Sequence, residues 1–156
     1  MGFAVTKFPE VTRIRAPAIG EFDAAVRSAR LAVDLAAKDA FSGPERLGNL
    51  AEVYMLVGRH DEAITDFNKA IELDPAKPDG YYYYGLSVGV YSDGVSVFTA
   101  LAEGLKDKTQ SSFEKTYEIN KMYNKAGPML SLGRFWAVLP WPMYDRKKSL
   151  KYYREY

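Results

Sequence analysis

The sequence predicts an all-α fold, an α-α superhelix of about three helical hairpins preceded by one further helix, with the second hairpin elongated. Apolar residues recur at spacings of three and four from about residue 21 to the C-terminus, as on the buried face of a helix. The pattern also returns 34 residues later, since Leu47 has its counterpart in Tyr81. A chain of 156 residues that is 47% hydrophobic is long enough for one compact domain or a short solenoid.

The N-terminal part is expected to be irregular at first and then helical. Residues 1–19 contain Pro9 and Pro17 among scattered charges and show no sustained period, which predicts an irregular arm. One helical domain is expected over residues 20–156. An alanine-rich apolar stripe over residues 21–40 predicts a lone helix that packs on the first hairpin. Ser42 and Glu45 then form a capping box at the start of the next helix.

Residues 44–75 carry the strongest pattern, two helices whose apolar faces fit each other. Ala51 and Ala63 are small enough for antiparallel helices to approach closely, and Tyr54 and Phe67 fill the seam between them. Gly58 supplies the turn. The spacing resembles the signature of the tetratricopeptide repeat (TPR), carried here by Leu47, Leu50, Ala51, Tyr54, Ala63, Phe67, Ala70 and Pro75.

The second unit, residues 78–121, repeats the first half of this motif as Tyr81, Tyr84, Gly85 and Val88. The second half is displaced to Phe113, which implies an insertion of roughly three helical turns. We expect helices over about 79–91 and 95–120, with a break at residues 92–94. The alternative is one long helix that breaks near residues 106–108.

The third unit, residues 127–156, repeats the first-helix motif after Gly127 and Pro128. Residues 139–142, Leu-Pro-Trp-Pro, force a turn, and Ser149 and Tyr153 take the small and bulky places of the closing helix. That helix is basic and aromatic with no helix after it, so its outer face is a solvated cap, a cut edge or a self-association surface. The motif residues of the first helix are Met129, Leu132, Gly133 and Trp136.

A narrower resemblance covers roughly residues 44–156. The elongated second hairpin, the segments 118–120, 124–128 and 132–134, and the Leu-Pro-Trp-Pro turn before a lysine-rich helix are similar to the TPR-type T-component of TRAP transporters. This resemblance implies a periplasmic, often lipid-anchored accessory protein of a bacterial transporter. Such a protein docks a substrate-binding protein and helps to handle an organic acid or a hydrophobic ligand. Without this role, a TPR chain is expected in the cytoplasm.

Composition argues against several other functions. A net charge of +1 gives no long-range field that favours nucleic acid or an anionic membrane, and no run reaches the ~20 apolar residues of a membrane span. Residues 1–9 lack the pattern of a signal peptide. There is no cysteine, and His60 is the one histidine, so no second imidazole or thiolate completes a metal or catalytic site. We therefore expect no enzyme activity and no cofactor.

The first helices of a TPR stack line its concave face, where partners bind. Of the four tyrosines at 81–84, Tyr81 and Tyr84 are expected in the core, whereas Tyr82 and Tyr83 face the groove or solvent. Trp141, held between two prolines, is either a partner-facing anchor or an ordinary turn residue. The expected groove consists of Glu52, Met55, Tyr82, Leu86, Gly89 and Arg134, with Trp141 beside it.

These features predict a non-enzymatic TPR interaction module or scaffold, in its most specific form a transporter-accessory protein, that docks another protein on its concave face. The alternative is a carrier that holds a small apolar or carboxylated ligand in the helical groove, with Arg134 for the negative group. A third interpretation is that the chain's own N-terminal arm or helix fills the groove. A homo-oligomer through the C-terminal helix is also compatible with the pattern.

Overall fold

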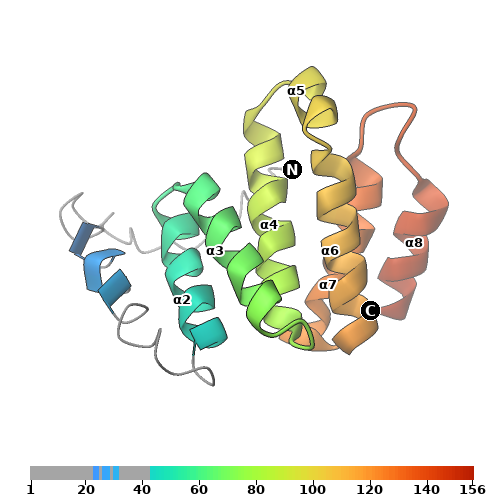
Figure 1. Ribbon diagram of the computed structural model, residues 1–156. Coiled ribbons are helices and arrows are strands. Elements are labelled where there is room, and N and C mark those ends of the chain that lie inside the picture. Colours follow the sequence, from blue (N-terminus) through green and yellow to red (C-terminus); the bar gives the residue numbers. More distant parts are fainter. Residues whose placement is uncertain (1–22, 25, 29, 32–42) are drawn as a thin grey trace, which may run out of the picture.

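The computed structural model describes residues 23–24, 26–28, 30–31 and 43–156. Every regular element in this part of the chain is a helix, which confirms the predicted all-α fold. From α2 to α8 the longer helices stand side by side in chain order, and the short helix α5 lies at the top between α4 and α6 (Figure 1). Their bounds are α2 Gly43–Leu56, α3 His60–Leu73, α4 Pro78–Gly94, α5 Val97–Ala102, α6 Leu105–Asn120, α7 Tyr123–Val138 and α8 Arg146–Glu155.

The helices α2 and α3 form the predicted first hairpin. Ala51, Ala63 and Phe67 are fully buried, because the small alanines let the helices close around the ring. Gly58 adopts the left-handed backbone conformation, with φ +77°, at the turn. The helix α3 ends at Leu73, two residues before the proline expected to stop it. Leu50, Tyr54 and Ala70 are buried here as well.

The predicted helix over residues 21–40 lies mostly outside the described residues. Those that are described between residues 23 and 31 are helical. Val26 is buried there and belongs to the same core cluster as Leu50 and Tyr54, so this segment packs on the first hairpin as expected. The irregular arm at residues 1–19 and Ser42 of the capping box also lie outside the described part.

The second hairpin pairs α4 with α6 and carries the expected insertion between them. Phe113 of α6 is buried, and it stands 46 residues after Phe67, 12 more than the 34 of a regular repeat. The insertion of about three helical turns is therefore present. Thr109 and Thr116 flank Phe113 in the two small positions, and the Thr116 hydroxyl donates to the backbone oxygen of Ser112 at 2.9 Å.

The helix bounds inside this hairpin differ from the prediction. The helix α4 continues to Gly94 instead of ending near residue 91, and residues 95–120 form two helices instead of one. The break lies at Gly104, which has φ +65°, and not near residues 106–108. The side chain of Ser96 accepts a hydrogen bond from the Thr99 backbone at 3.1 Å and starts the short helix α5.

The third unit consists of α7 and α8. Three residues at the start of α7, Asn124, Lys125 and Ala126, have left-handed backbone angles, and right-handed helix continues through Pro128. Leu132 and Met129 are buried, and a Cβ added at Gly133 would lie 2.8 Å from Tyr153 Cε1. The helices α7 and α8 thus approach closely where the motif predicted. Ser149 is buried, as is Trp136.

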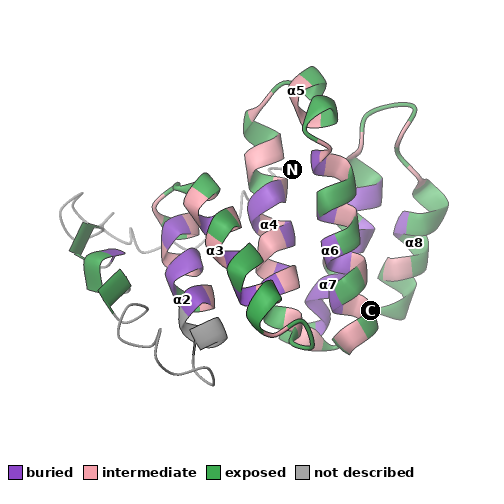
Figure 2. Ribbon diagram, in the orientation of Figure 1, coloured by how far each residue is buried: buried purple, intermediate pink, exposed green. Residues whose placement is uncertain are grey.

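Buried residues concentrate on α2, α3, α4, α6 and α7, whereas α5 has none (Figure 2). Aromatic contacts join the units, since the Phe67 and Tyr83 rings stack with centroids 5.7 Å apart.

No helix in the described part of the chain combines the length and the apolar character needed to cross a membrane.

Candidate functional site

One face of α4 borders two separate depressions. Residues 79, 83, 86 and 90 recur on this face at helical spacing. Asp79 and Tyr83, near the start of the helix, border the smaller depression, and Leu86 and Val90, near its end, border the larger. The concave face expected from the sequence is therefore divided into two parts of different character.

The larger depression, called the apolar groove below, has a volume of about 540 Å³. Helix α4 forms one wall, the inserted helix α5 covers one end, and α6, α7 and the segment after α7 complete it. Most of its lining side chains are aliphatic or aromatic, which suits an apolar ligand or segment. They include Leu86, Val90, Val95, Val97, Leu101, Phe113, Phe135, Val138, Leu139 and Met143.

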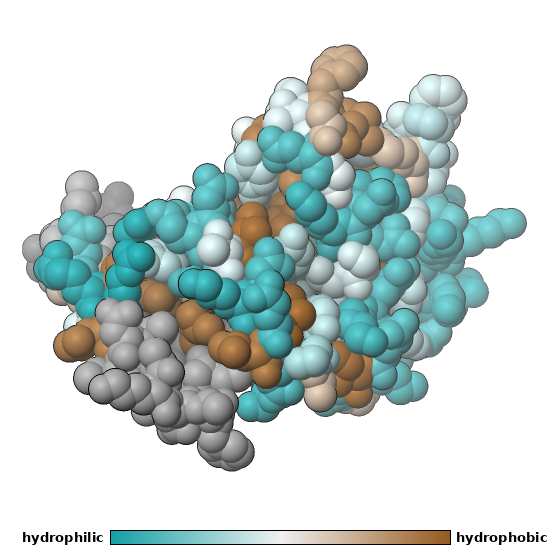
Figure 3. Space-filling model, in the orientation of Figure 1, coloured by the Kyte–Doolittle hydropathy of each residue, from teal (hydrophilic) through white to brown (hydrophobic). Residues whose placement is uncertain are grey.

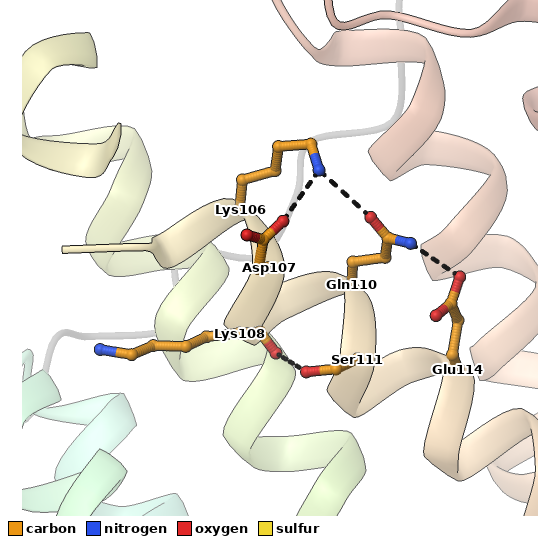
Figure 4. Close-up of polar contacts among 6 residues, drawn as sticks. All are labelled: Lys106, Asp107, Lys108, Gln110, Ser111 and Glu114. Atoms are coloured by element: carbon orange, nitrogen blue, oxygen red, sulfur yellow. Dashed lines mark hydrogen bonds and ion pairs between the residues drawn. The ribbon is translucent and has the colours of Figure 1, made fainter. Parts of the chain in front are cut away.

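Two cations, Lys106 and Arg134, and one carboxylate, Asp93, also line the apolar groove. The Lys106 amine donates to Asp107 at 3.0 Å and to Gln110 at 3.3 Å (Figure 4). The Gln110 side-chain amide in turn donates to Glu114, one turn further along α6, at 2.9 Å. These partners hold the Lys106 charge against its own helix. Arg134 is exposed at the groove, so its guanidinium is placed to bind an anionic group.

The smaller depression lies between α2 and the start of α4 and has a volume of about 280 Å³. It is called the acidic depression below, because its charged lining residues are the carboxylates Glu52, Asp74 and Asp79 and the single cation Lys77. Burial raises the pKa of Tyr83, and the charge of Glu52 raises it further. Tyr83 therefore stays a neutral hydroxyl at physiological pH.

Tyr123, the first residue of α7, contacts the start of α4. Its hydroxyl donates to Asp79 Oδ1 at 2.9 Å. Burial, followed by this hydrogen bond, holds the pKa of Tyr123 far above its usual range. The contact ties the start of the third unit to the start of α4, so the two walls of the site are held together.

The expectation that Tyr82 faces the groove or solvent is wrong. Its side chain is only 7% exposed and packs with Phe113 and Leu132. The reason is that the start of the third unit lies across it: a Cβ added at Gly127 would be 2.6 Å from the Tyr82 hydroxyl. Glycine at position 127 is the sequence feature that indicates this close approach, and the sequence of α4 alone does not contain it.

The other predicted groove residues are distributed over both depressions and the core. Leu86, Gly89 and Arg134 do come together in the apolar groove. Glu52 borders the acidic depression instead, and Met55 packs on the core of the first hairpin. Trp141 is 81% exposed in the segment between α7 and α8 and lines neither depression. Its role as an anchor for a partner therefore stays a prediction.

The sequence prediction did not assign the groove residues from the insertion, namely Val97, Leu101 and Lys106. Val97 and Leu101 stand four residues apart on α5, a spacing that indicates a shared helix face without showing what that face contacts. Tyr81 and Tyr84, expected in the core, are half-buried. Among the described residues, no group of three or more histidine, cysteine, aspartate or glutamate side chains is arranged to hold a metal.

Comparison with protein families matches residues 44–77 to the tetratricopeptide repeat. The matched residues cover α2, α3 and the turn before α4, so the match falls on the hairpin that the sequence pattern identified. The search of curated proteins found no match. Among solved structures, the chain is similar to a crystal structure of MamA, with 21% identity, a TM-score of 0.39 and coverage of 87% of this chain and 86% of that one.

Proposed function

We propose that this TPR-containing chain is a non-enzymatic interaction scaffold that holds an apolar segment of another protein in the groove between α4, α5, α6 and α7. The observation that carries the proposal is the groove itself, about 540 Å³ in volume and lined mainly by apolar side chains. TPR hairpins are used for protein binding, and an amphipathic segment laid into an apolar groove is a common mode of recognition.

The rim of the groove supports a protein segment as the occupant. Val90, Val97 and Val138 line the groove and are each about half exposed or more, at 47%, 53% and 64%. Apolar side chains that continue from a groove onto its rim extend the contact beyond a small ligand. Arg134 adds one site for a carboxylate of the partner, which would fix the orientation of the segment.

Two glycines allow the proposed groove to be tested against the acidic depression. Gly89 borders the apolar groove, and a Cβ there would meet only Thr109 Cγ2 at 3.9 Å. Gly48 borders the acidic depression, and its Cβ would meet nothing within 4 Å. Both lie inside helices, where replacing glycine gains about 1 kcal/mol of helix propensity. Gly89→Leu and Gly48→Leu should therefore each fill one depression in a folded chain.

The readout is photocrosslinking with p-benzoylphenylalanine at position 101, in the groove, and at position 56 as a control. Leu101 and Leu56 are both exposed leucines, at 51% and 79%. We expect position 101 to give a protein adduct of one defined mass that position 56 does not give. Gly89→Leu should remove the adduct and Gly48→Leu should leave it. The reverse pattern would place the binding site in the acidic depression and refute the proposal.

The narrower form of the proposal is a transporter-accessory role, in which the partner is a substrate-binding protein. Two features support it: the elongated hairpin with its inserted helix α5, and the Leu-Pro-Trp-Pro segment between α7 and α8. Mass spectrometry of the adduct from position 101 tests this form. A substrate-binding protein in the adduct would support it, and any other protein would leave the general scaffold and reject the transporter role.

The second candidate is a carrier of a small apolar or carboxylated ligand, favoured by a groove volume within the range of about 300–1,000 Å³ typical of small-molecule sites. Dodecanoate and dodecanol, which differ in their head groups, provide the test by calorimetric titration. Arg134→Gln should weaken dodecanoate binding by about tenfold, as loss of one charged hydrogen bond does, and leave dodecanol unchanged. No heat with either compound would reject the carrier function.

A further inference from the structure

One end of the molecule exposes large apolar side chains on two separate elements. The inserted helix α5 forms one projection, and the segment 139–145 between α7 and α8 forms another at the same end (Figure 1). Hydrophobic side chains gather on the α5 projection in the space-filling view (Figure 3). The exposed fractions are Phe98 86%, Trp141 81%, Val138 64%, Val97 53%, Tyr144 52% and Leu101 51%.

The two projections are neighbours, because both border the apolar groove. Val97 and Leu101 line it from α5, and Pro140 and Met143 line it from the segment 139–145. Phe98 and Trp141 do not line the groove, so they extend the apolar surface outward from its edge. Single exposed apolar residues are normal on proteins, but a contiguous group at one end indicates a contact surface.

The composition of this surface fits the boundary of a lipid bilayer. Tryptophan and tyrosine are enriched where membrane meets water, since one part of each ring is apolar and the other forms hydrogen bonds. Trp141 and Tyr144 come from the turn, and Phe98 comes from α5. Helix α5 has no buried residue, and its Phe98 side chain is 86% exposed, so this ring is available for contact outside the chain.

Cations surround the two projections. Lys106, which is paired with Asp107, and the exposed Lys108 lie in the first turn of α6, Arg134 lies at the groove, and three exposed cations follow the turn at the start of α8. Four carboxylates, at residues 93, 103, 107 and 145, lie in the same region of the sequence. The cations are more numerous, so the local charge is positive although the whole chain has a net charge of only +1. The cations after the turn are Arg146, Lys147 and Lys148.

We propose that this end of the molecule, called the apolar end, binds the surface of a bilayer that contains anionic lipid. Phe98 and Trp141 enter the interface, and the cations behind them contact lipid phosphates. Apolar insertion supplies most of the affinity, and lipid charge adds a smaller part that salt weakens. The inference goes beyond the proposed scaffold, because it concerns side chains outside the groove.

Tryptophan fluorescence provides a direct test, because the chain has only two tryptophans and Trp136 is buried. We expect vesicles of phosphatidylcholine and phosphatidylglycerol at 7:3 to shift the emission to shorter wavelength and brominated lipid to quench it. Trp141→Phe should abolish both changes. No shift and no quenching with the unaltered chain would overturn the proposal.

Vesicle sedimentation measures the affinity with a matched pair of variants. Phe98→Ser combined with Trp141→Ser should lower partitioning about tenfold or more. Leu56→Ser combined with Leu73→Ser removes two other exposed apolar residues, at 79% and 60%, from the first hairpin and should leave partitioning unchanged. Pure phosphatidylcholine should bind more weakly than the mixed vesicles, and the difference should shrink in 0.5 M NaCl.

Several results would contradict binding of the apolar end to a bilayer. Equal loss in both double variants would show that lipid binds non-specifically to exposed apolar residues and would overturn the proposal. So would retained vesicle binding when Phe98 and Trp141 are both replaced. If the vesicles do not bind but the same substitutions remove the protein adduct from position 101, the apolar end is part of the protein interface. The vesicle measurements do not depend on the Gly89→Leu test, so lipid binding can hold even if the groove binds no protein segment.

Discussion

The close approach of α4 and α6 can be tested by adding one methyl group at Gly85. A Cβ there would lie 3.0 Å from Phe113 Cε1, 3.1 Å from Phe113 Cδ1 and 3.2 Å from Ser112 Cβ. Phe113 is 5% exposed and Ser112 Cβ is fixed to its backbone, so neither can move aside freely. Overpacking of this kind costs about 1–3 kcal/mol. The gain in helix propensity from Gly85→Ala offsets about 1 kcal/mol of it.

Gly89→Ala is the matched control for this change. Gly89 is one turn further along α4, and its added Cβ would meet only Thr109 Cγ2, at 3.9 Å, an ordinary contact. The propensity gain is the same in both variants because both residues lie inside one helix. The difference in stability between the two therefore isolates the packing cost. We expect Gly89→Ala to be more stable than Gly85→Ala by about 1–3 kcal/mol.

Urea unfolding followed by helical circular dichroism measures this difference. Thermal unfolding should agree, since each kcal/mol corresponds to roughly 2–4 °C in Tm for a chain of this size. The m-value should be the same in both variants, because the surface exposed on unfolding does not change. If Gly85→Ala is stabilised as much as Gly89→Ala, the seam between α4 and α6 is not close-packed, and the explanation of Gly85 as a helix-contact glycine is refuted.

Three further predictions concern pH, the core and the surface. Folding raises the pKa of Tyr123, so its contribution to the free energy of unfolding is complete below the unfolded pKa of about 10 and is lost above it at up to about 1.4 kcal/mol per pH unit. Tyr123→Phe should therefore make the free energy of unfolding in urea depend less on pH between 9 and 11. Leu132→Ala, at a fully buried position, should cost about 2–5 kcal/mol, whereas Leu56→Ala should change unfolding by less than about 0.5 kcal/mol. Arg59→Ala should cost less than about 1 kcal/mol, and 1 M NaCl should remove the loss, because its ion pair with Glu62 is exposed.

The first hairpin could be predicted from the sequence because its determinants are local. Ala51 and Ala63 are fully buried, and Gly58 turns the chain between them, as their spacing required. Each helix presents its small and large residues to a helix only a few positions away in the sequence. The match of residues 44–77 to the TPR confirms that part of the prediction.

The second hairpin was harder to predict because threonine takes the place of alanine. Thr109 and Thr116 are buried at 6% and 0% exposure, in positions where the sequence pattern sought small apolar residues. Threonine can be buried there because its hydroxyl bonds to its own helix, as Thr116 does to the Ser112 carbonyl. The pattern therefore located the bulky Phe113 but not the small residues on either side of it.

The position of Tyr82 could not be derived from its own helix. A helical projection of α4 places it on the concave side, and contacts with later segments, among them Gly127 45 positions further on, cover it. That contact depends on the left-handed backbone of residues 124–126, which turns the chain across α4. Non-local packing of this kind decided which part of the expected groove stayed open, and it left Leu86 and Gly89 accessible but not Tyr82.

The inserted helix α5 links the groove to the apolar end while contributing little to the fold. A helix of six residues is too short to be stable alone, and α5 buries none of its side chains. Its apolar residues therefore do not stabilise a core, and they would lower solubility if they had no other role. Val97 and Leu101 line the groove, whereas Phe98 points outward, so one short insertion supplies both candidate contact surfaces. Substitutions in α5 should for this reason alter binding while leaving unfolding nearly unchanged, and substitutions in the seam between α4 and α6 should do the opposite.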